Sequence, residues 1–551
     1  MFPRRSPRNY QPVFRIYNNG TGTNYPTAFR IHLEALVVRN RLDKIRQRGV
    51  CDPPGGSGLT LLFVRKSLSA QNQSRSRPVG IKIVETQAVS SEELPPILLK
   101  KQTIPLFAMP RHSRKERSNS TMQFRGARRL DVRAICDVAT PIRKASWIHP
   151  YPAKMLGEIA GSIVLSLPVP REPRFPLTMV DPMCGSGTTL LYGLCAGWTV
   201  KGFDPNPLAT LISRVKIARY EEKTLEFWLQ KLAKAILAVR HQDTIALKES
   251  DEFTSLRYWL WPSVLDEIAT FRLALDELSL PTKYRNFLLV AASSSIRPVS
   301  KADPEVVPPT ISKKTQKALG PGRPRSFLTA FNFQAKKIKS SLLAPMLQGL
   351  QRHGSRVRCE DARGLDLEGG CADYIIMSPP YFTAHDYVRS VHLELLALGM
   401  CSIEELHELR VRTIGSASAY GNRISSLGLY HCDSTIENIR KRHEQRARML
   451  CRYLLQMKDV LSECTRILKP QGSLVIVIGG STSQGLTVPT AKLIAELCSS
   501  VGMQLDSMPV VNAIRSRGFM TRRNVTAGVI EDEWILRFTH SERGGAIPRF
   551  T

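Results

Sequence analysis

The chain has 551 residues, of which 42% are hydrophobic, and its 78 Lys plus Arg against 47 Asp plus Glu give a formal charge of +31. This composition excludes a largely disordered chain and a coiled coil, and the length allows about two to four domains. A basic surface gains affinity for nucleic acid by releasing condensed counterions, so a polyanion is the expected partner, with an anionic membrane surface as the alternative.

The first 130 residues carry more than half of the excess charge, with 24 Lys plus Arg against 7 Asp plus Glu. Strand-like stretches there, LTLLFVRK and GIKIVETQAV, alternate with basic polar stretches, and no helical period persists. The chain start lacks the apolar region of a signal peptide, and no apolar run reaches the ~18 residues of a membrane span. We predict a basic N-terminal region over 1–130, either a small domain or a partly ordered arm, in a cytoplasmic, nucleoid-associated protein without membrane contact.

From about residue 131, apolar strand-like runs alternate with amphipathic helical stretches, which is typical of an α/β domain with a mostly parallel sheet. The runs cover 177–182, 198–205, 355–362, 372–380 and 472–480. Some 150 residues of helical character separate the second run from the third, more than one crossover needs. We predict a Rossmann-like domain over 131–551 with a helical insertion at 220–350.

The helix before the fifth run has apolar residues at three- and four-residue spacing, from Leu450 to Leu468, and Pro470 and Gly472 are expected to end it. The 11 cysteines, spread from Cys51 to Cys498, form neither a CxxC pair nor a cluster with zinc-ligand spacing. We therefore expect free thiols and no metal site.

A glycine-rich turn closes the first run, in the sequence Asp181-Pro182-Met183-Cys184-Gly185-Ser186-Gly187-Thr188-Thr189. Its glycines let the backbone approach a ligand closely, and a following helix offers unpaired N–H groups to a carboxylate or phosphate, although a purely structural turn has the same pattern. The second run ends in Asp204, 17 residues after Gly187, where an acid can accept both hydroxyls of a ribose. Together these features predict a nucleoside-containing cofactor.

Ser378-Pro379-Pro380-Tyr381 ends the fourth run, at the edge of the sheet where such folds bind ligands. Two prolines cannot donate to a strand ladder, so the chain must leave the sheet in a stiff turn with exposed carbonyls. A polar side chain and a proline carbonyl can accept both hydrogens of a flat amino group, and the tyrosine can stack on the ring that bears it. An ordinary strand-end turn is the alternative.

These motifs resemble those of the amino-methylating DNA methyltransferases, which modify the exocyclic nitrogen of cytosine or adenine. DPMCGSGTT looks like their S-adenosylmethionine-binding loop, and SPPY looks like their catalytic motif, which more often begins with Ser in the cytosine-N4 members. Other segments resemble a bacterial subgroup with an HPYPAK segment; they are His149–Lys154, 295–303, 386–390 and the region 514–536. The resemblance covers roughly 135–540.

The resemblance implies site-specific methyl transfer from S-adenosylmethionine to the amine of a flipped base in double-stranded DNA, with N4 of cytosine favoured over N6 of adenine. It implies catalytic roles for Ser378, Pro379, Pro380 and Tyr381. Asp181, Gly185 and Gly187 would hold the methionine end of the cofactor, Asp204 its ribose and Asp361 its adenine. The remaining cofactor-binding residues would be Met183, Cys184, Thr188, His149 and Lys154, although a solvated turn would also explain the segment His149–Lys154.

Target recognition would lie in the insertion 220–350 or in residues 385–445, whose charges could equally be solvated faces. His385, Asp386, Tyr387 and Arg389 would either line the base pocket or order its loop. A cognate restriction or defence component is a further candidate partner.

Two other functions fit part of the sequence. Guanine-N2 methyltransferases of tRNA also pair a DPxCGSGT-like loop with a PPY motif, and a basic appendage would suit RNA, but they usually have Asp or Asn before PPY. A non-catalytic nucleic-acid-binding protein could retain the fold, which the intact Asp181, Asp204 and SPPY disfavour.

Overall fold

The computed structural model describes residues 128–130, 140–152, 154–168, 176–303, 306–311, 325–382, 386–416, 424–483, 486–506, 510–513 and 532–541. The chain divides into two units, Met1–Pro95 and Pro96–Thr551, and all described residues belong to the second. The predicted N-terminal region, apart from 128–130, lies outside the described residues.

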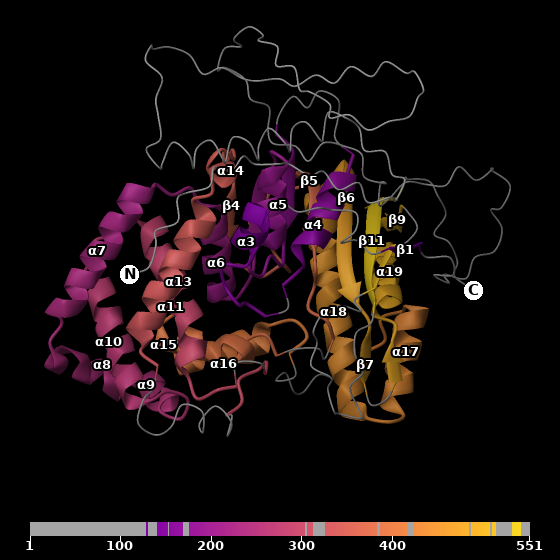
Figure 1. Ribbon diagram of the computed structural model, residues 1–551. Coiled ribbons are helices and arrows are strands. Elements are labelled where there is room, and N and C mark those ends of the chain that lie inside the picture. The colour runs from indigo at the N-terminus through magenta and orange to yellow at the C-terminus, as the bar shows by residue number, and fades with distance from the viewer. Residues whose placement is uncertain are drawn as a thin grey trace, which may run out of the picture. The chain divides into compact units, whose positions relative to one another are not determined.

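The described part of the chain contains a nine-stranded sheet in the order β1-β10-β11-β6-β5-β2-β3-β4, with β9 against β11 (Figure 1). The parallel centre of the sheet consists of β2 (Thr178–Asp181), β3 (Thr199–Phe203), β4 (Arg356–Arg358), β5 (Ala372–Met377) and β6 (Leu468–Gly479). β11 (Asp532–His540) runs antiparallel to β6, to β9 (Met503–Leu505) and to β10 (Val510–Ala513), and β10 pairs with β1 (Arg128–Leu130). Each predicted run therefore coincides with one parallel strand, although β6 begins four residues before its run, and the predicted Rossmann-like α/β fold is confirmed.

Helices cover both faces of the sheet because alternate strand side chains point to opposite faces. Met179 and Val475 belong to a core shared with α3 (Thr140–Ser146), α4 (Gly157–Ser166), α5 (Thr188–Cys195) and α6 (Pro207–Ile217). Val180 and Ile476 belong to a second core, shared with α17 (Tyr430–Arg440), α18 (Glu444–Ile467) and α19 (Thr490–Ser500). Each fully buried aliphatic side chain in these cores contributes about 1.5–3 kcal/mol.

Helix α18 is the helix predicted before the fifth strand, and its residues at the predicted spacing are buried. It ends at Ile467, so Leu468 is already the first residue of β6 while still packing in the same core. The helix thus stops just before Pro470, as a residue without an N–H requires.

The described residues between β3 and β4 are mainly helical, as predicted. They form α6, α7 (Glu222–Ala238), η1 (His241–Thr244), α8 (Ile245–Glu249), α9 (Asp251–Leu256), α10 (Pro262–Asp276), α11 (Thr282–Val299), α13 (Phe327–Leu342) and α14 (Pro345–Gln348). Helix α11 packs on α6 and α13, and the buried side chains of these helices join the first core. The insertion therefore extends the core of the sheet and does not form a core of its own.

The remaining described elements are η2 (Arg389–Val391), α15 (His392–Ala397), α16 (Ile403–Arg412), β7 (Ser481–Ser483) and β8 (Leu486–Val488). None of the helices within the described ranges combines the length and apolar character needed to cross a bilayer.

Strand β2 lies between β3 and β5, so the order of the sheet reverses there. Open α/β sheets bind ligands at this reversal, beyond the carboxyl ends of the strands. The glycine-rich turn after β2 and the SPPY motif after β5 both lie at this place.

Candidate active site

The turn between β2 and α5 requires its two glycines. Gly185 and Gly187 have φ angles of 49° and 73°, which other residues adopt only with strain. A Cβ on Gly187 would lie 2.6 Å from the hydroxyl of Ser213 on α6, whereas the nearest atom to a Cβ on Gly185 is a ring carbon of Tyr151, 3.9 Å away. The turn is packed tightly on α6 at Gly187 and leaves room for a ligand at Gly185.

Two carboxylates lie at the ends of the neighbouring strands β2 and β3. Asp181, 2% exposed, accepts the Met183 N–H at 3.0 Å and the hydroxyl of Thr189. Asp204 accepts the N–H of Gly185 at 3.0 Å and that of Asn206 at 2.9 Å. Burial raises the pKa of Asp181 to about 7 and that of Asp204 to about 6. Both acids are held rigidly at the turn, and a cationic or hydrogen-bond-donating ligand would favour their ionised forms.

The other predicted cofactor residues of the turn take part in the same structure. The N–H of Cys184 donates to the Phe203 carbonyl at 2.9 Å, which ties the turn to β3. Thr188 begins α5 and is buried, and its hydroxyl has no hydrogen-bond partner among the described residues.

The SPPY motif leaves β5 directly after Met377 and is fixed by contacts from distant segments. The Tyr381 hydroxyl donates to Glu533 at 2.9 Å, and the Tyr381 N–H donates to the hydroxyl of Tyr387 at 3.3 Å. Glu533 pairs with Gly479, the last residue of β6, so the start of antiparallel β11 lies at the carboxyl edge of the parallel strands. Sequence reasoning assigned no role to Glu533, because only the sheet order brings it to Tyr381.

Tyrosines connect the SPPY motif with the glycine-rich turn. Burial raises the pKa of Tyr387 to about 12, and the negative charge of nearby Asp204 acts in the same direction. The pKa of Tyr151 is raised by burial and again by Asp204. The charge of Asp204 therefore acts on both tyrosines, and the two predicted motifs follow the adjacent strands β2 and β5 at one edge of the sheet.

The segment His149–Lys154 lies between α3 and α4, with Ala153 outside the described residues. The His149 ring, 3% exposed, contacts the Ser293 hydroxyl of α11 through Nε2 at 2.9 Å. Lys154 donates to the His149 carbonyl at 3.0 Å, and its Nζ lies 3.6 Å from the centre of the Trp147 ring. The segment reaches the turn through Tyr151, while its histidine points to the insertion.

Asp361 follows β4 and is held by its own loop. Its Oδ1 accepts the backbone N–H and Nε of Arg363 at 3.0 and 2.9 Å, and Arg363 lowers its pKa despite partial burial. Asp361 thus lies on the predicted edge of the sheet with part of its hydrogen-bonding capacity already used.

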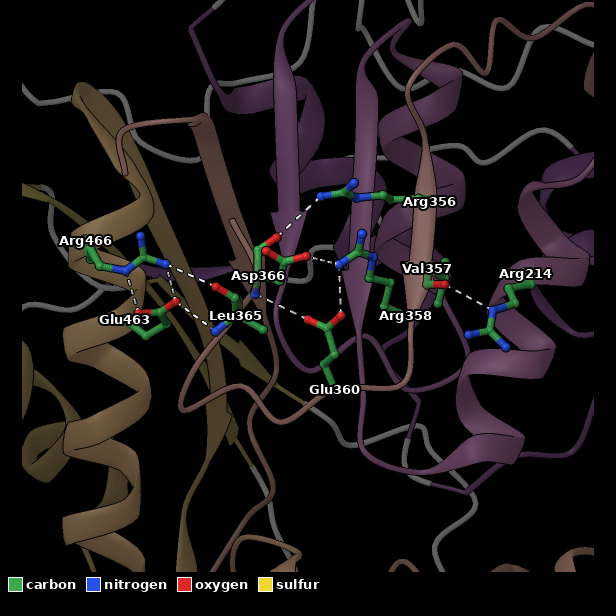
Figure 2. A network of polar contacts seen from close by, with 9 residues as sticks. All are labelled: Arg214, Arg356, Val357, Arg358, Glu360, Leu365, Asp366, Glu463 and Arg466. Carbon is green, nitrogen blue, oxygen red and sulfur yellow. Dashed lines mark hydrogen bonds and ion pairs between the residues drawn. The ribbon is translucent and has the colours of Figure 1, made fainter. Parts of the chain in front are cut away.

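Figure 2 shows how the loop after β4 is anchored on both sides. Arg358 pairs with Glu360 at 3.2 Å and with Asp366. On the other side the Leu365 N–H donates to Glu463 of α18 at 2.9 Å, and Glu463 pairs with Arg466 at 2.5 Å. Because these ion pairs are partly exposed, each adds little to the free energy of folding. Their effect is to fix the position of the loop.

The two regions predicted for target recognition differ in structure. Residues 220–350 are the helical insertion, and the described part of 385–445 forms η2, α15, α16 and α17. Arg410 of α16 pairs with Asp386 at 3.0 Å, and Arg412 ends the helix with an exposed side chain. His385 and the segment 514–531 lie outside the described residues.

No cluster of three or more His, Cys, Asp or Glu side chains suited to a metal ion occurs in the part of the chain that the structure describes. All the cysteines within it are free.

Comparison with known proteins agrees with this geometry. Residues 372–544, which contain SPPY and β11, match the family described as DNA methylase that comprises N6 and N4 methyltransferases. The Type II methyltransferase M.MvaI of Kocuria varians is 21% identical over 372 residues, covering 63% of this chain and 80% of that protein. These two matches support the assignment of the chain to the amino-methylating DNA methyltransferases. It is an enzyme, and its methyl donor is S-adenosylmethionine.

More distant relatives match a smaller part of this methyltransferase. The Type II methyltransferases M.AvaI of Nostoc sp. and of Anabaena variabilis are each 23% identical over 162 residues, or 26% of this chain and 34% of those proteins. The family assignment agrees with neither the tRNA alternative nor the non-catalytic one.

Proposed function

We propose that this methyltransferase modifies N4 of cytosine at specific sites in double-stranded DNA. The observation that carries the proposal is that the glycine-rich turn and SPPY follow the adjacent parallel strands β2 and β5 and so lie at the same edge of the sheet. Ser378 at the first position of the motif favours cytosine over adenine, and N6 of adenine is the alternative target. The names of the relatives, all Type II methyltransferases, favour a role beside a restriction or defence component.

The residues of the turn fit S-adenosylmethionine. Gly185 leaves its backbone open to a ligand, and Asp181 offers a buried carboxylate to the cationic methionine end, beside Gly187 and the backbone of Met183, Cys184 and Thr188. Lone pairs remain on the Asp204 carboxylate for ribose hydroxyls, because within the described ranges each oxygen accepts a single N–H. We assign Asp361 to the adenine, and His149 and Lys154 to the methionine side.

The cofactor supplies an electrophilic methyl group on a sulfonium, and the chain has to present the amine to it. The lone pair of the exocyclic amine is delocalised into the base. The Ser378 side chain and the Pro379 carbonyl would accept hydrogen bonds from the two N–H groups of the amine. These bonds would favour the pyramidal, nucleophilic amine, and Pro380 would keep the turn stiff. This transfer needs no covalent enzyme intermediate, so no cysteine thiol is given a catalytic role.

The target base must leave the duplex to reach SPPY, at a cost of a few kcal/mol. Stacking on the Tyr381 ring offsets this cost, and the bond from its hydroxyl to Glu533 fixes the ring plane before the base arrives. We place DNA contacts on the insertion 220–350, on the arginines of 385–445 and on the basic N-terminal region.

The test is transfer of labelled methyl from S-adenosylmethionine to duplex DNA and, in parallel, to bulk tRNA, followed by nucleoside mass analysis. We expect label in N4-methylcytosine, and no label with the Ser378→Ala variant. Label in N6-methyladenine would overturn the choice of base, and label in tRNA alone would overturn the DNA substrate.

A further inference from the structure

Lys216 of α6 is a buried lysine beside the glycine-rich turn. Its side chain is 2% exposed, and its Nζ donates to the hydroxyl of Ser186 in the turn at 3.3 Å. Among the described residues no carboxylate lies within ion-pair distance of this ammonium. Lys154, the other lysine that acts on this place, differs because it donates to the His149 carbonyl. Lysine is almost never fully buried unless it is paired.

The surroundings of Lys216 are positive. Burial lowers its pKa well below the usual value, and the charge of Lys154 lowers it further. The same two lysines act on the buried ring of His149, whose pKa falls to about 3, chiefly through burial. Burying lysines close together costs free energy of folding. The arrangement therefore indicates a site for an anionic ligand that offsets their positive charge.

His149 supplies a second, independent sign of a ligand. The Ser293 hydroxyl donates to the Val290 carbonyl at 3.1 Å, so it accepts from Nε2–H of the neutral His149 ring. This assignment from the hydrogen-bond network leaves Nδ1 as an acceptor, and Nδ1 is buried without a partner among the described residues. A ligand that brings both an anion and an N–H donor would satisfy Lys216 and His149 together.

We propose that Lys216, supported by Ser186, binds the carboxylate of the methionine end of S-adenosylmethionine, and that His149 Nδ1 accepts a hydrogen from the adjacent ammonium. This rests on the proposed cofactor site at the turn. The α-amino-acid end of the cofactor carries an ammonium and a carboxylate. Lys216 on α6 has the charge that suits the carboxylate, and Asp181 at the end of β2 has the charge that suits the ammonium. Burial keeps Lys216 away from a DNA phosphate.

One consequence concerns protons. Burial lowers the pKa of Lys216, and a carboxylate beside it favours the ammonium form, so cofactor binding raises this pKa again. Cofactor binding is therefore coupled to proton uptake at this side chain.

The experiment is a double-mutant cycle by calorimetry on the full chain. S-adenosylmethionine and its decarboxylated analogue are titrated into the wild-type enzyme and into Lys216→Met. We expect the wild type to lose about 10- to 100-fold in affinity when the carboxylate is absent, as for a charge-assisted hydrogen bond, and Lys216→Met to bind both ligands equally. If Lys216→Met discriminates between the ligands as the wild type does, the proposal is wrong.

Three further measurements sharpen the test. Lys339→Met is the matched control, because this lysine pairs with Glu222 and Glu226 and should leave the discrimination intact. Ser186→Ala provides a second variant with a smaller expected loss, should Lys216→Met not fold. Titration in two buffers of different ionisation enthalpy should show more net proton uptake in the wild type than in Lys216→Met, because protons exchanged by Asp181 and Asp204 are common to both, and equal uptake would overturn the proposal. Failure of the wild type to bind S-adenosylmethionine would instead reject the cofactor site itself.

Discussion

Replacing Asp181 by Asn should stabilise the cofactor-free enzyme while destroying its cofactor site. Burial raises the pKa of this carboxyl from 3.8 to about 7. A raised folded-state pKa gives stability that is fully present below pH 3.8 and is lost as the pH rises through 7. Asparagine is neutral at every pH, so the variant avoids this loss.

The size of the effect follows from the shift of about 3 pKa units. At about 1.4 kcal/mol per unit, ionised Asp181 costs up to about 4 kcal/mol at pH 8, and about 2 kcal/mol at pH 5, where the folded protein keeps the proton. The amide oxygen of Asn can still accept the Met183 N–H, and the Thr189 hydroxyl can rotate to accept from the amide nitrogen.

The assay is urea unfolding of the cofactor-free wild type and Asp181→Asn at pH 5 and pH 8. We expect the variant to have the higher midpoint at pH 8 and a smaller advantage at pH 5, together with loss of S-adenosylmethionine binding. Asp266→Asn, at a side chain that is 49% exposed, is the matched control and should show no such pH-dependent gain. A variant that is no more stable than the wild type at pH 8 would show that ionised Asp181 does not destabilise the folded protein.

Other variants separate the roles of the site. Ser378→Ala and Tyr381→Ala should abolish methyl transfer with cofactor affinity nearly unchanged, and an equal loss of cofactor binding by calorimetry would contradict the assigned roles. Glu533→Ala should lower kcat about 3- to 10-fold by releasing the Tyr381 ring, whereas Glu533→Gln, which still accepts the bond, should recover most of it; 2-aminopurine fluorescence at the target base reports the stacking. Cofactor affinity should fall as the pH drops below about 6, where Asp204 takes up a proton, and an affinity independent of pH would exclude a role for its charge. Deleting residues 1–127, which spares β1, should weaken DNA binding and flatten its salt dependence, and an unchanged salt slope would show that this region does not contact phosphates.

Local patterns in the sequence were sufficient to predict the parallel strands and both motifs. Except for β4, which is Arg-Val-Arg, these strands are mainly apolar runs followed closely by an acid, a glycine or a proline, and these signals act within a few residues. The spacing on α18 predicted its buried face for the same reason, and the two-proline turn after β5 follows from backbone chemistry alone. The roles of the individual site residues stay predictions.

Contacts between distant segments depended on the tertiary structure. The bond from Tyr381 to Glu533 exists because antiparallel β11 begins at the carboxyl edge of β6. His149 contacts Ser293 of α11, which is 144 residues away in the chain, and the motif spacing could not indicate this contact.

Strand and turn signals are local, so the amino-acid pattern is enough to indicate which chemistry-bearing residues follow which strands. Which of these residues meet became evident from the folded chain, as did the burial of Lys216 beside the turn without an acidic partner among the described residues. Burial and pairing could not be predicted because they depend on the order of the strands and on the helices packed over them. A lysine on an amphipathic helix has the same sequence context whether it faces water or a ligand.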